Sequence, residues 1–319
     1  MMMFYLRKIF LGFFYLFLIS LVAFMMVRQM PGDPAVLIAN QNRETEAPPE
    51  VVERIRTEYG FDRPLPEQYW RWLRRGVLEG DLGHSTRTRQ PVTEAVLGSL
   101  PVSLRLAGLT FGLTLLISLP LGLLAGVTGK PHLDAAVQGM AWINYSFPVF
   151  LLAVVSIWLF AVEWQLLPAV GREGIRSWIL PAAVLTLHLS GWTTQVIRSS
   201  VREVAEKPFI QAARAKGLQH WRIVLIHILK PAVLPILTAL LVQLGHLFSG
   251  SFIIETIFAW NGIGRLLVDS ILARDFPVIQ GILLYVGAVF AVINVLIDLL
   301  YQYLNPSARE TLGRGSSVR

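Results

Sequence analysis

The amino-acid sequence predicts an all-α polytopic membrane protein with six transmembrane helices, a small external subdomain between the first two, and a short cytoplasmic helix between the fourth and fifth. Composition gives the first reason: 54% of the 319 residues are hydrophobic and 15% are charged, whereas soluble domains carry about a quarter charged residues. A series of apolar runs close to the ~20 residues that a spanning helix needs gives the second. The third is that Lys and Arg concentrate in the short segments predicted to face the cytoplasm.

Charge and residue usage exclude several other classes of protein. The net charge of +7 would suggest a nucleic-acid partner in a soluble chain, but here the topology explains the excess, so none is predicted. The absence of cysteine excludes disulfides, thiolate metal sites and a cysteine nucleophile. The sequence has no HExxH motif and no carboxylate cluster with metal-ligand spacing. We therefore expect a protein that is not an enzyme and that binds neither a cofactor nor a metal directly.

The N-terminal segment, residues 1–30, is predicted to be the first transmembrane helix. Arg7 and Lys8 precede an apolar run from Ile9 to Val27. A cleavable signal peptide begins in the same way, but this run is long enough to span and no small-residue cleavage site follows it. The charge order places the N-terminus in the cytoplasm.

Residues 31–99 are polar and mixed, and we interpret them as an external subdomain. Proline and glycine in 30–34 end the first helix. A helix-like stretch at 50–59 and an aromatic-rich one at 67–73 follow, separated by turns. His84 lies beside Gly83, and a lone histidine in such a place is more often a turn residue than a metal ligand.

Residues 100–304 are predicted to form a core of five further spans, and residues 305–319 a cytoplasmic tail that carries three arginines. Small residues four apart in the second span, Gly108 with Gly112 and Gly122 with Gly126, predict close helix packing in lipid. The predicted spans are Pro101–Thr128, Asp134–Val162, Trp178–Val196, Pro231–Thr256 and Val278–Tyr303.

A basic segment that does not span, Glu203–Pro235, separates the fourth and fifth of the six spans. Ile210 and Ala213 fall on a narrow face of apolar and small residues, whereas the cations point elsewhere, which predicts a short amphipathic helix at the membrane surface. Small residues on that face would let another protein's backbone approach, and Gly217 is expected to stop the helix. The alternative is a basic loop that only fixes the topology.

The spacing in this segment resembles the coupling loop of bacterial ABC importer permeases. Gln211-Ala212-Ala213 is followed after three residues by Gly217, and ARAKGL with His227 and Lys230 is similar to the variant of the dipeptide, oligopeptide and nickel permease family. PGDP, YGFDRPLPEQYWRWL, GDLGHS, PVTEAV, IIETIFAWNGIGRLLVDSI and ARDFPVIQG resemble further landmarks of that family, in the same order. Gln211 stands where glutamate is usual, and Asn261 where proline is usual.

The resemblance implies a bacterial inner-membrane permease with both termini in the cytoplasm and the external subdomain facing a substrate-binding protein. Its implied partners are a second homologous permease subunit, two cytoplasmic ATPase subunits that use ATP and Mg²⁺, and a periplasmic or lipid-anchored binding protein. The coupling loop would be 199–229. Its ATPase-coupling residues would be Ala205, Phe209, Ala212, Ala213, Lys216 and Gly217.

Four polar residues within the predicted spans are candidates for the solute path, because burying such groups in a bilayer is costly and is most often tied to function. An ion-coupled secondary transporter is the alternative of a different class, but it would show internal repeats and carboxylates near the span centres, which this sequence lacks. A structural or receptor subunit would not need the coupling loop. The four candidates are His188, Gln243, His246 and Glu255.

The substrate is the least determined feature at this stage. The outer loop Glu163–Ser177 is short, which looks more like nickel-type permeases than like dipeptide permeases with an insertion there. We therefore expect nickel or a metal chelate by a small margin, with di- and oligopeptides as the alternative.

Overall fold

The computed structural model describes residues 2–28, 33–40, 46–171 and 174–304. Throughout these ranges the chain is helix and turn, and the only strand-like pairing in them is a bridge between His84 and Pro91. The tail at 305–319 and the predicted helix break at 30–32 lie outside the described residues. The all-α prediction is confirmed.

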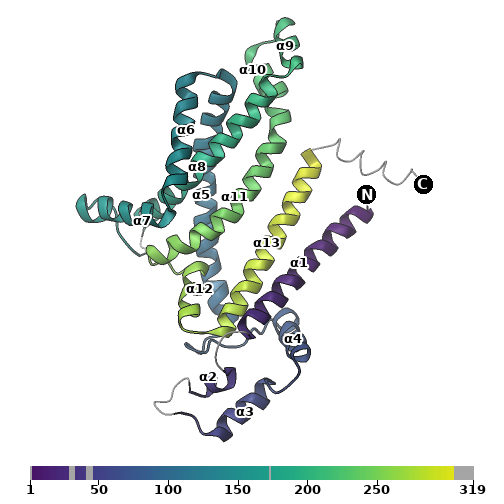
Figure 1. Cartoon of the computed structure of the whole chain (residues 1–319), viewed down its shortest axis with the longest axis vertical. Coiled ribbons are helices and arrows are strands. Elements are labelled where there is room, and N and C mark those ends of the chain that lie inside the picture. Colours follow the sequence, from purple (N-terminus) through teal and green to yellow (C-terminus); the bar gives the residue numbers. More distant parts are fainter. Residues whose placement is uncertain (1, 29–32, 41–45, 172–173, 305–319) are drawn as a thin grey trace. The chain divides into compact units, whose positions relative to one another are not determined.

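The chain forms two compact units, and each is described by itself (Figure 1). The first unit comprises Met1–Leu100 and Leu266–Asp298, and the second comprises Pro101–Arg265 and Leu299–Arg319. This division differs from the predicted single core at 100–304, because most of the last apolar helix groups with the N-terminal region. The packing of that helix is not visible in the sequence, since its partner lies more than 200 positions away along the chain.

In the first unit, the N-terminal helix packs against the last helix. A Cβ added at Gly287 would lie 2.7 Å from Cγ2 of Ile19, so glycine permits this approach. The Tyr69 hydroxyl lies 2.7 Å from the Ser20 hydroxyl, which ties the aromatic-rich segment to the N-terminal helix. The helices of this unit are α1 (Met2–Arg28), α2 (Pro34–Asn40), α3 (Pro49–Tyr59), α4 (Leu65–Arg74), the π-helical η1 (Arg75–Glu79) and most of α13 (Phe276–Leu304).

The second unit is a helical bundle with two buried apolar clusters. Figure 1 shows α9 and α10 at the opposite end of this unit from α7. Its helices, of which α5 and α12 run past the unit boundary, are α5 (Val92–Thr128), α6 (Pro131–Ser146), α7 (Val149–Ile157), η2 (Trp158–Glu163), α8 (Arg176–Ala205), α9 (Pro208–Ala215), α10 (His220–Arg222), η3 (Ile223–Leu229), α11 (Lys230–Ile257) and α12 (Ile263–Leu272).

The predicted third span, Asp134–Val162, is not one helix. It is broken between α6 and α7 at Phe147 and Pro148, and Figure 1 shows the two helices meeting at a steep angle. Pro148 has no N–H to donate to the preceding turn, and it pushes the residue before it away from helical dihedrals. Pro148 itself has φ −58° and ψ 142°, so the chain is extended where α7 begins. The prediction was wrong on this point because it gave the apolar run more weight than the proline.

Three helices in the described part of the chain are long and apolar enough to cross a membrane: Val92–Thr128, His220–Gly245 and Phe276–Val295. Two shorter apolar helices, Gly12–Met26 and Val149–Glu163, accompany them. α8 has the length to span, at 30 residues, but it carries many hydroxyl and basic side chains. The polytopic character is thus confirmed, and the order of six spans stays a prediction.

One of the two predicted small-residue pairs packs closely. A Cβ at Gly122 would lie 2.7 Å from the side chain of Ile197, and a Cβ at Gly126 would lie 2.8 Å from that of Val201, so this pair brings α5 against α8. Gly108 and Gly112 have nothing within 4 Å of the same position in the structure. The close contact therefore lies in the C-terminal half of α5.

Candidate functional site

The short cytoplasmic helix predicted from the sequence is α9, and its ends follow from its residues. Pro208 occupies the first turn, where its missing N–H is not needed by the helix. The helix ends at Ala215, and Gly217 adopts a left-handed conformation with φ +72°, which glycine reaches without steric cost. The N–H of Gly217 donates to the Arg214 carbonyl at 3.0 Å. Both the amphipathic helix and its stop at glycine are confirmed.

The two faces of α9 have different surroundings. Ile210 and Ala213 are buried, at 0% and 6% exposure, in a cluster that α8, η3 and α11 also build. Ala213 therefore faces its own chain, which differs from the expectation that its small side chain would meet a partner's backbone. Phe209 is 45% exposed, and Ala212 and Lys216 are exposed beside it. α9 thus rests on the bundle and presents these side chains outward.

A cluster of charges ties the last turns of α8, which lead into α9, to the start of α6. The Asp134 carboxylate accepts hydrogen bonds from Nε of Arg198 at 2.6 Å and from a terminal nitrogen of Arg202 at 2.8 Å. The side chains of Asp134 and Arg198 are about five-sixths buried, with exposures of 17% and 16%. Arg202 also donates to Glu206, the residue that follows α8, and hydrogen bonds to Glu206 and Asp134 raise the pKa of Arg202.

The sequence did not predict this cluster. Arg198 and Arg202 indicated only the topology, and Asp134 indicated only the start of a span. The available signal was a carboxylate three residues after the turn Gly129-Lys130-Pro131, on the side of the membrane where cations are predicted to gather. Its partners could not be named, since they lie 64 and 68 positions further on.

The candidate solute-path residues have separate surroundings. Gln243 is 2% exposed and donates to the Leu189 carbonyl at 3.1 Å, so its amide joins α11 to α8. His188 is half-buried on α8. His246 belongs to α11, but its side chain lies outside what the structure describes.

Glu255, the fourth candidate, is fully buried and holds a turn. Its Oε2 accepts a hydrogen bond from the Gly264 N–H at 2.7 Å, while the Ser103 hydroxyl accepts one from the Ile263 N–H at 2.8 Å. These amides belong to the first turn of α12, where a carboxylate also favours the helix dipole. A Cβ at Gly262 would lie 2.3 Å from Oε2 of Glu255, so the turn needs glycine there. These contacts favour a structural role for Glu255 over contact with a solute.

A second buried carboxylate joins two motifs of the first unit. Asp275 is 2% exposed, and it accepts hydrogen bonds from the Thr86 N–H at 2.9 Å and from the Ser85 hydroxyl at 2.5 Å. The GDLGHS and ARDFP motifs are thus in contact through one aspartate. His84 is exposed, but it lies in the strand-like bridge to Pro91, just before the turn at 86–88, so its expected place within a turn is not what the structure has. In the described residues there is no group of three or more His, Cys, Asp or Glu side chains that could hold a metal.

Solved structures identify the class of fold. The chain is similar in fold to an inward-facing MetNI methionine ABC transporter, with a TM-score of 0.57 and 19% identity over 66% of this chain and 96% of that chain. An amino acid ABC transporter with histidines gives a TM-score of 0.52 at 17% identity, covering 66% and 94%. The chain therefore shares its fold with chains of these two ABC transporter structures.

The family follows from the sequence comparisons. Residues 118–310 match the family described as binding-protein-dependent transport system inner membrane component, and residues 1–107 match its N-terminal companion. The chain belongs to this family, the permease subunits of ABC importers, which are non-catalytic membrane components. The resemblance inferred from the ordered motifs is confirmed.

Curated relatives cover nearly the whole chain. A protein named as a peptide transport system permease of Brucella abortus (strain 2308) is 37% identical over 300 residues, which is 92% of this chain and 94% of the relative. The glutathione transport system permease protein GsiC of Escherichia coli (strain K12) is 35% identical over 294 residues, with the same two shares.

Proposed function

We propose that this chain is a permease subunit of an ATP-driven, binding-protein-dependent importer of di- or oligopeptides. The observation that carries the proposal is the likeness over 92% of the chain to relatives named as peptide and glutathione permeases. The expected preference for nickel rested on the short loop Glu163–Ser177, and no relative reported above is named for nickel. Loop length reflects the architecture of the outer face, so it is weak evidence for the substrate.

The proposed assembly follows from the family. A second permease subunit would complete the pore, two cytoplasmic ATPase subunits would hydrolyse ATP with Mg²⁺, and an external binding protein would deliver the peptide. The chain would lie in the bacterial inner membrane with both termini in the cytoplasm, in keeping with its basic cytoplasmic segments. The external subdomain, 31–99, would face the binding protein.

We assign the contact with the ATPase to the exposed side of α9. Phe209 offers a large apolar side chain to a partner, and Ala212 and Lys216 flank it. Ile210 and Ala213, which are buried against the bundle, would pass a displacement of α9 to α8 and α11, because a packed core transmits strain. Ala205 and Gly217 would fix the two ends of the moving segment. His188, Gln243 and His246 stay candidates for the solute path.

The proposal is tested in a strain that lacks this chain. Growth on a dipeptide as the required amino-acid source should fail and should return when the chain is restored, while cellular nickel content stays unchanged. Retained peptide growth together with a fall in nickel would contradict the proposal and favour a metal permease. The control is the same strain grown on the free amino acids, which should grow in every case.

A further inference from the structure

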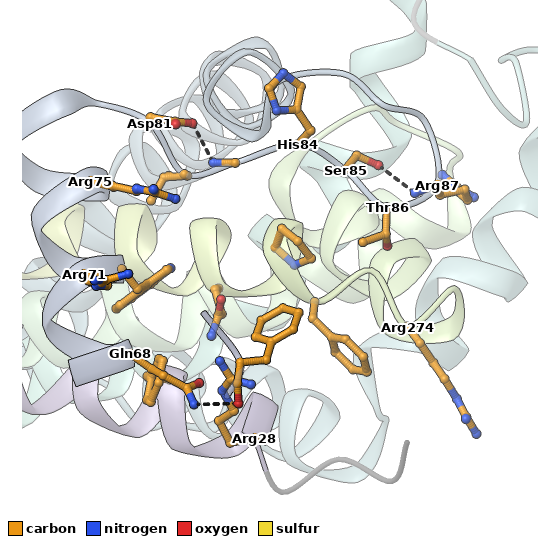
Figure 2. A pocket seen from close by; sticks show the side chains of 18 of the residues that line it. Arg28, Gln68, Arg71, Arg75, Asp81, His84, Ser85, Thr86, Arg87 and Arg274 are labelled. Carbon is orange, nitrogen blue, oxygen red and sulfur yellow. Dashed lines mark hydrogen bonds between the residues drawn. The ribbon is translucent and has the colours of Figure 1, made fainter. Parts of the chain in front are cut away.

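The first unit contains a pocket to which none of the roles proposed above is assigned (Figure 2). Its volume is about 800 Å³, within the range of small-molecule sites. The end of α1, the helix α4, the loop at 81–89 and the start of α13 form its walls, so all of it belongs to one compact unit. A small ligand of a few hundred daltons would fit this volume.

The walls of the pocket are strongly cationic. Six arginines line it against two carboxylates, Glu58 and Asp81. Asp81 accepts a hydrogen bond from the Gly83 N–H at 2.8 Å, so one of its carboxylate oxygens already has a partner within the chain. Figure 2 shows Arg28, Arg71 and Arg75 around one end of the pocket. The lining arginines are Arg28, Arg71, Arg75, Arg87, Arg89 and Arg274. The pocket therefore favours a negatively charged ligand.

Among the arginines that line the pocket, Arg28 is the one that a bound anion would stabilise most. It is half-buried at the end of α1, and its guanidinium carbon lies 5.3 Å from the ring centre of Phe24 and 4.8 Å from that of Phe61. The structure gives it no carboxylate within 4.0 Å among the described residues, whereas Arg71 is paired with Glu67 at 3.3 Å. A partly desolvated guanidinium without a counter-ion is unfavourable, and a bound carboxylate would offset this in bidentate geometry.

The side-chain amide of Gln68, also in the wall of the pocket, has an incomplete set of hydrogen bonds. Gln68 is 8% exposed and donates from Nε2 to the carbonyls of Arg63 and Phe61, at 2.6 and 3.2 Å, as Figure 2 indicates in part. Its Oε1 is buried and accepts no hydrogen bond from the described residues. An unmade hydrogen bond of this kind costs free energy until a donor arrives. Gln280, 9% exposed, lines the same pocket with a further amide.

Together the arginines and the aromatic side chains of the walls favour a ligand with an oxyanion and an apolar portion. Phe61, Trp72 and Phe276 supply apolar surface for the last of these. We propose that the pocket binds a short acidic peptide, with a carboxylate at Arg28 and its apolar part against Phe61, Trp72 and Phe276. The assignment rests on the proposed function as a peptide permease and adds a site outside the bundle where acidic peptides are retained.

The test uses the complete importer, with its partner permease and ATPases, in nanodiscs of phosphatidylcholine without the binding protein. Equilibrium dialysis measures the binding of a radiolabelled tripeptide with two glutamates and of its glutamine counterpart. The acidic peptide should bind saturably and at least roughly tenfold more tightly than the neutral one, and binding should weaken as salt rises. Equal binding of the two peptides, or no saturable binding, would overturn the proposal.

Variants locate the site. Arg28→Gln should weaken binding of the acidic peptide roughly tenfold, since it removes a charge-assisted hydrogen bond from a partly buried place. Arg75→Gln provides a second lining variant in case the first does not fold, and it should weaken binding in the same direction. Arg54→Gln is the matched control, because Arg54 is an exposed arginine of α3 that does not line the pocket. Wild-type affinity in the folded lining variants would overturn the assignment.

Two further experiments distinguish a peptide from a lipid as the ligand, and the pocket proposal from the proposed function. Discs with phosphatidylglycerol test whether a lipid headgroup takes the place, and loss of peptide binding there would overturn the peptide assignment in favour of a lipid phosphate. Growth on a neutral dipeptide of the strain that lacks this chain, with and without its restoration, tests the proposed function alone. Growth that depends on this chain, together with no preference for the acidic tripeptide, would reject the pocket and leave the function standing.

Discussion

Individual residues show what the sequence could and could not reveal. The polar candidates within the spans were found from the sequence, because such groups stand out in apolar runs. Their partners were not, since Glu255 meets Gly264 only through a turn and Gln243 meets a carbonyl on another helix. The buried Asp275 was passed over for the same reason, because its partners lie near residue 86.

The turn held by Glu255 gives a prediction for a single residue. Gly262→Ala would place a Cβ 2.3 Å from the Glu255 carboxylate and 2.7 Å from the Ser103 hydroxyl, so the buried hydrogen bonds must shift. We expect a loss of about 1–3 kcal/mol in the free energy of unfolding, seen as a lower Tm of the purified protein in detergent. Gly108→Ala is the control, since that position is open and alanine favours a helix. An unchanged Tm for Gly262→Ala would refute the close packing of this turn.

At the scale of elements, the spacing of apolar runs and turn residues predicted most helices. The short helix α9 and its glycine stop were available from spacing alone, because they depend on local chemistry. The break between α6 and α7 was also local, and Pro148 was its signal. The tie between α6 and α8 was not local, since it joins charges brought together only by packing.

That tie gives a prediction about energy coupling. Asp134→Ala should leave Arg198 without its carboxylate, loosen the base of α9, and lower peptide transport per ATP hydrolysed several-fold in proteoliposomes. Asp134→Glu should restore much of the ratio, because a carboxylate remains within reach. Asp62→Asn is the control, because Asp62 is an exposed carboxylate of the first unit, away from this cluster. A fall in ATP hydrolysis and transport by the same factor would show a purely structural role.

At the scale of the whole molecule, the sequence predicted the class, the order of the motifs and the family. It did not predict that the last apolar helix groups with the N-terminal region, because no local pattern records which helix packs with which. It also gave no firm substrate. The residues that resemble the family serve architecture and coupling, so they are shared by permeases for different solutes.

We propose that the exposed side of α9 couples ATP hydrolysis by the ATPase subunits to peptide transport through this chain. The most direct measurement is ATP-dependent uptake of a labelled dipeptide into proteoliposomes that contain the complete importer, for wild type, Phe209→Ala and Trp221→Ala. Both aromatics are exposed, at 45% and 55%, but Trp221 lies beyond Gly217, outside the assigned contact. We predict that uptake falls at least roughly tenfold for Phe209→Ala, because a few large side chains supply most of the binding energy of an interface. Uptake should stay near the wild-type level for Trp221→Ala. Equal uptake by wild type and Phe209→Ala, or uptake without ATP, would contradict the account.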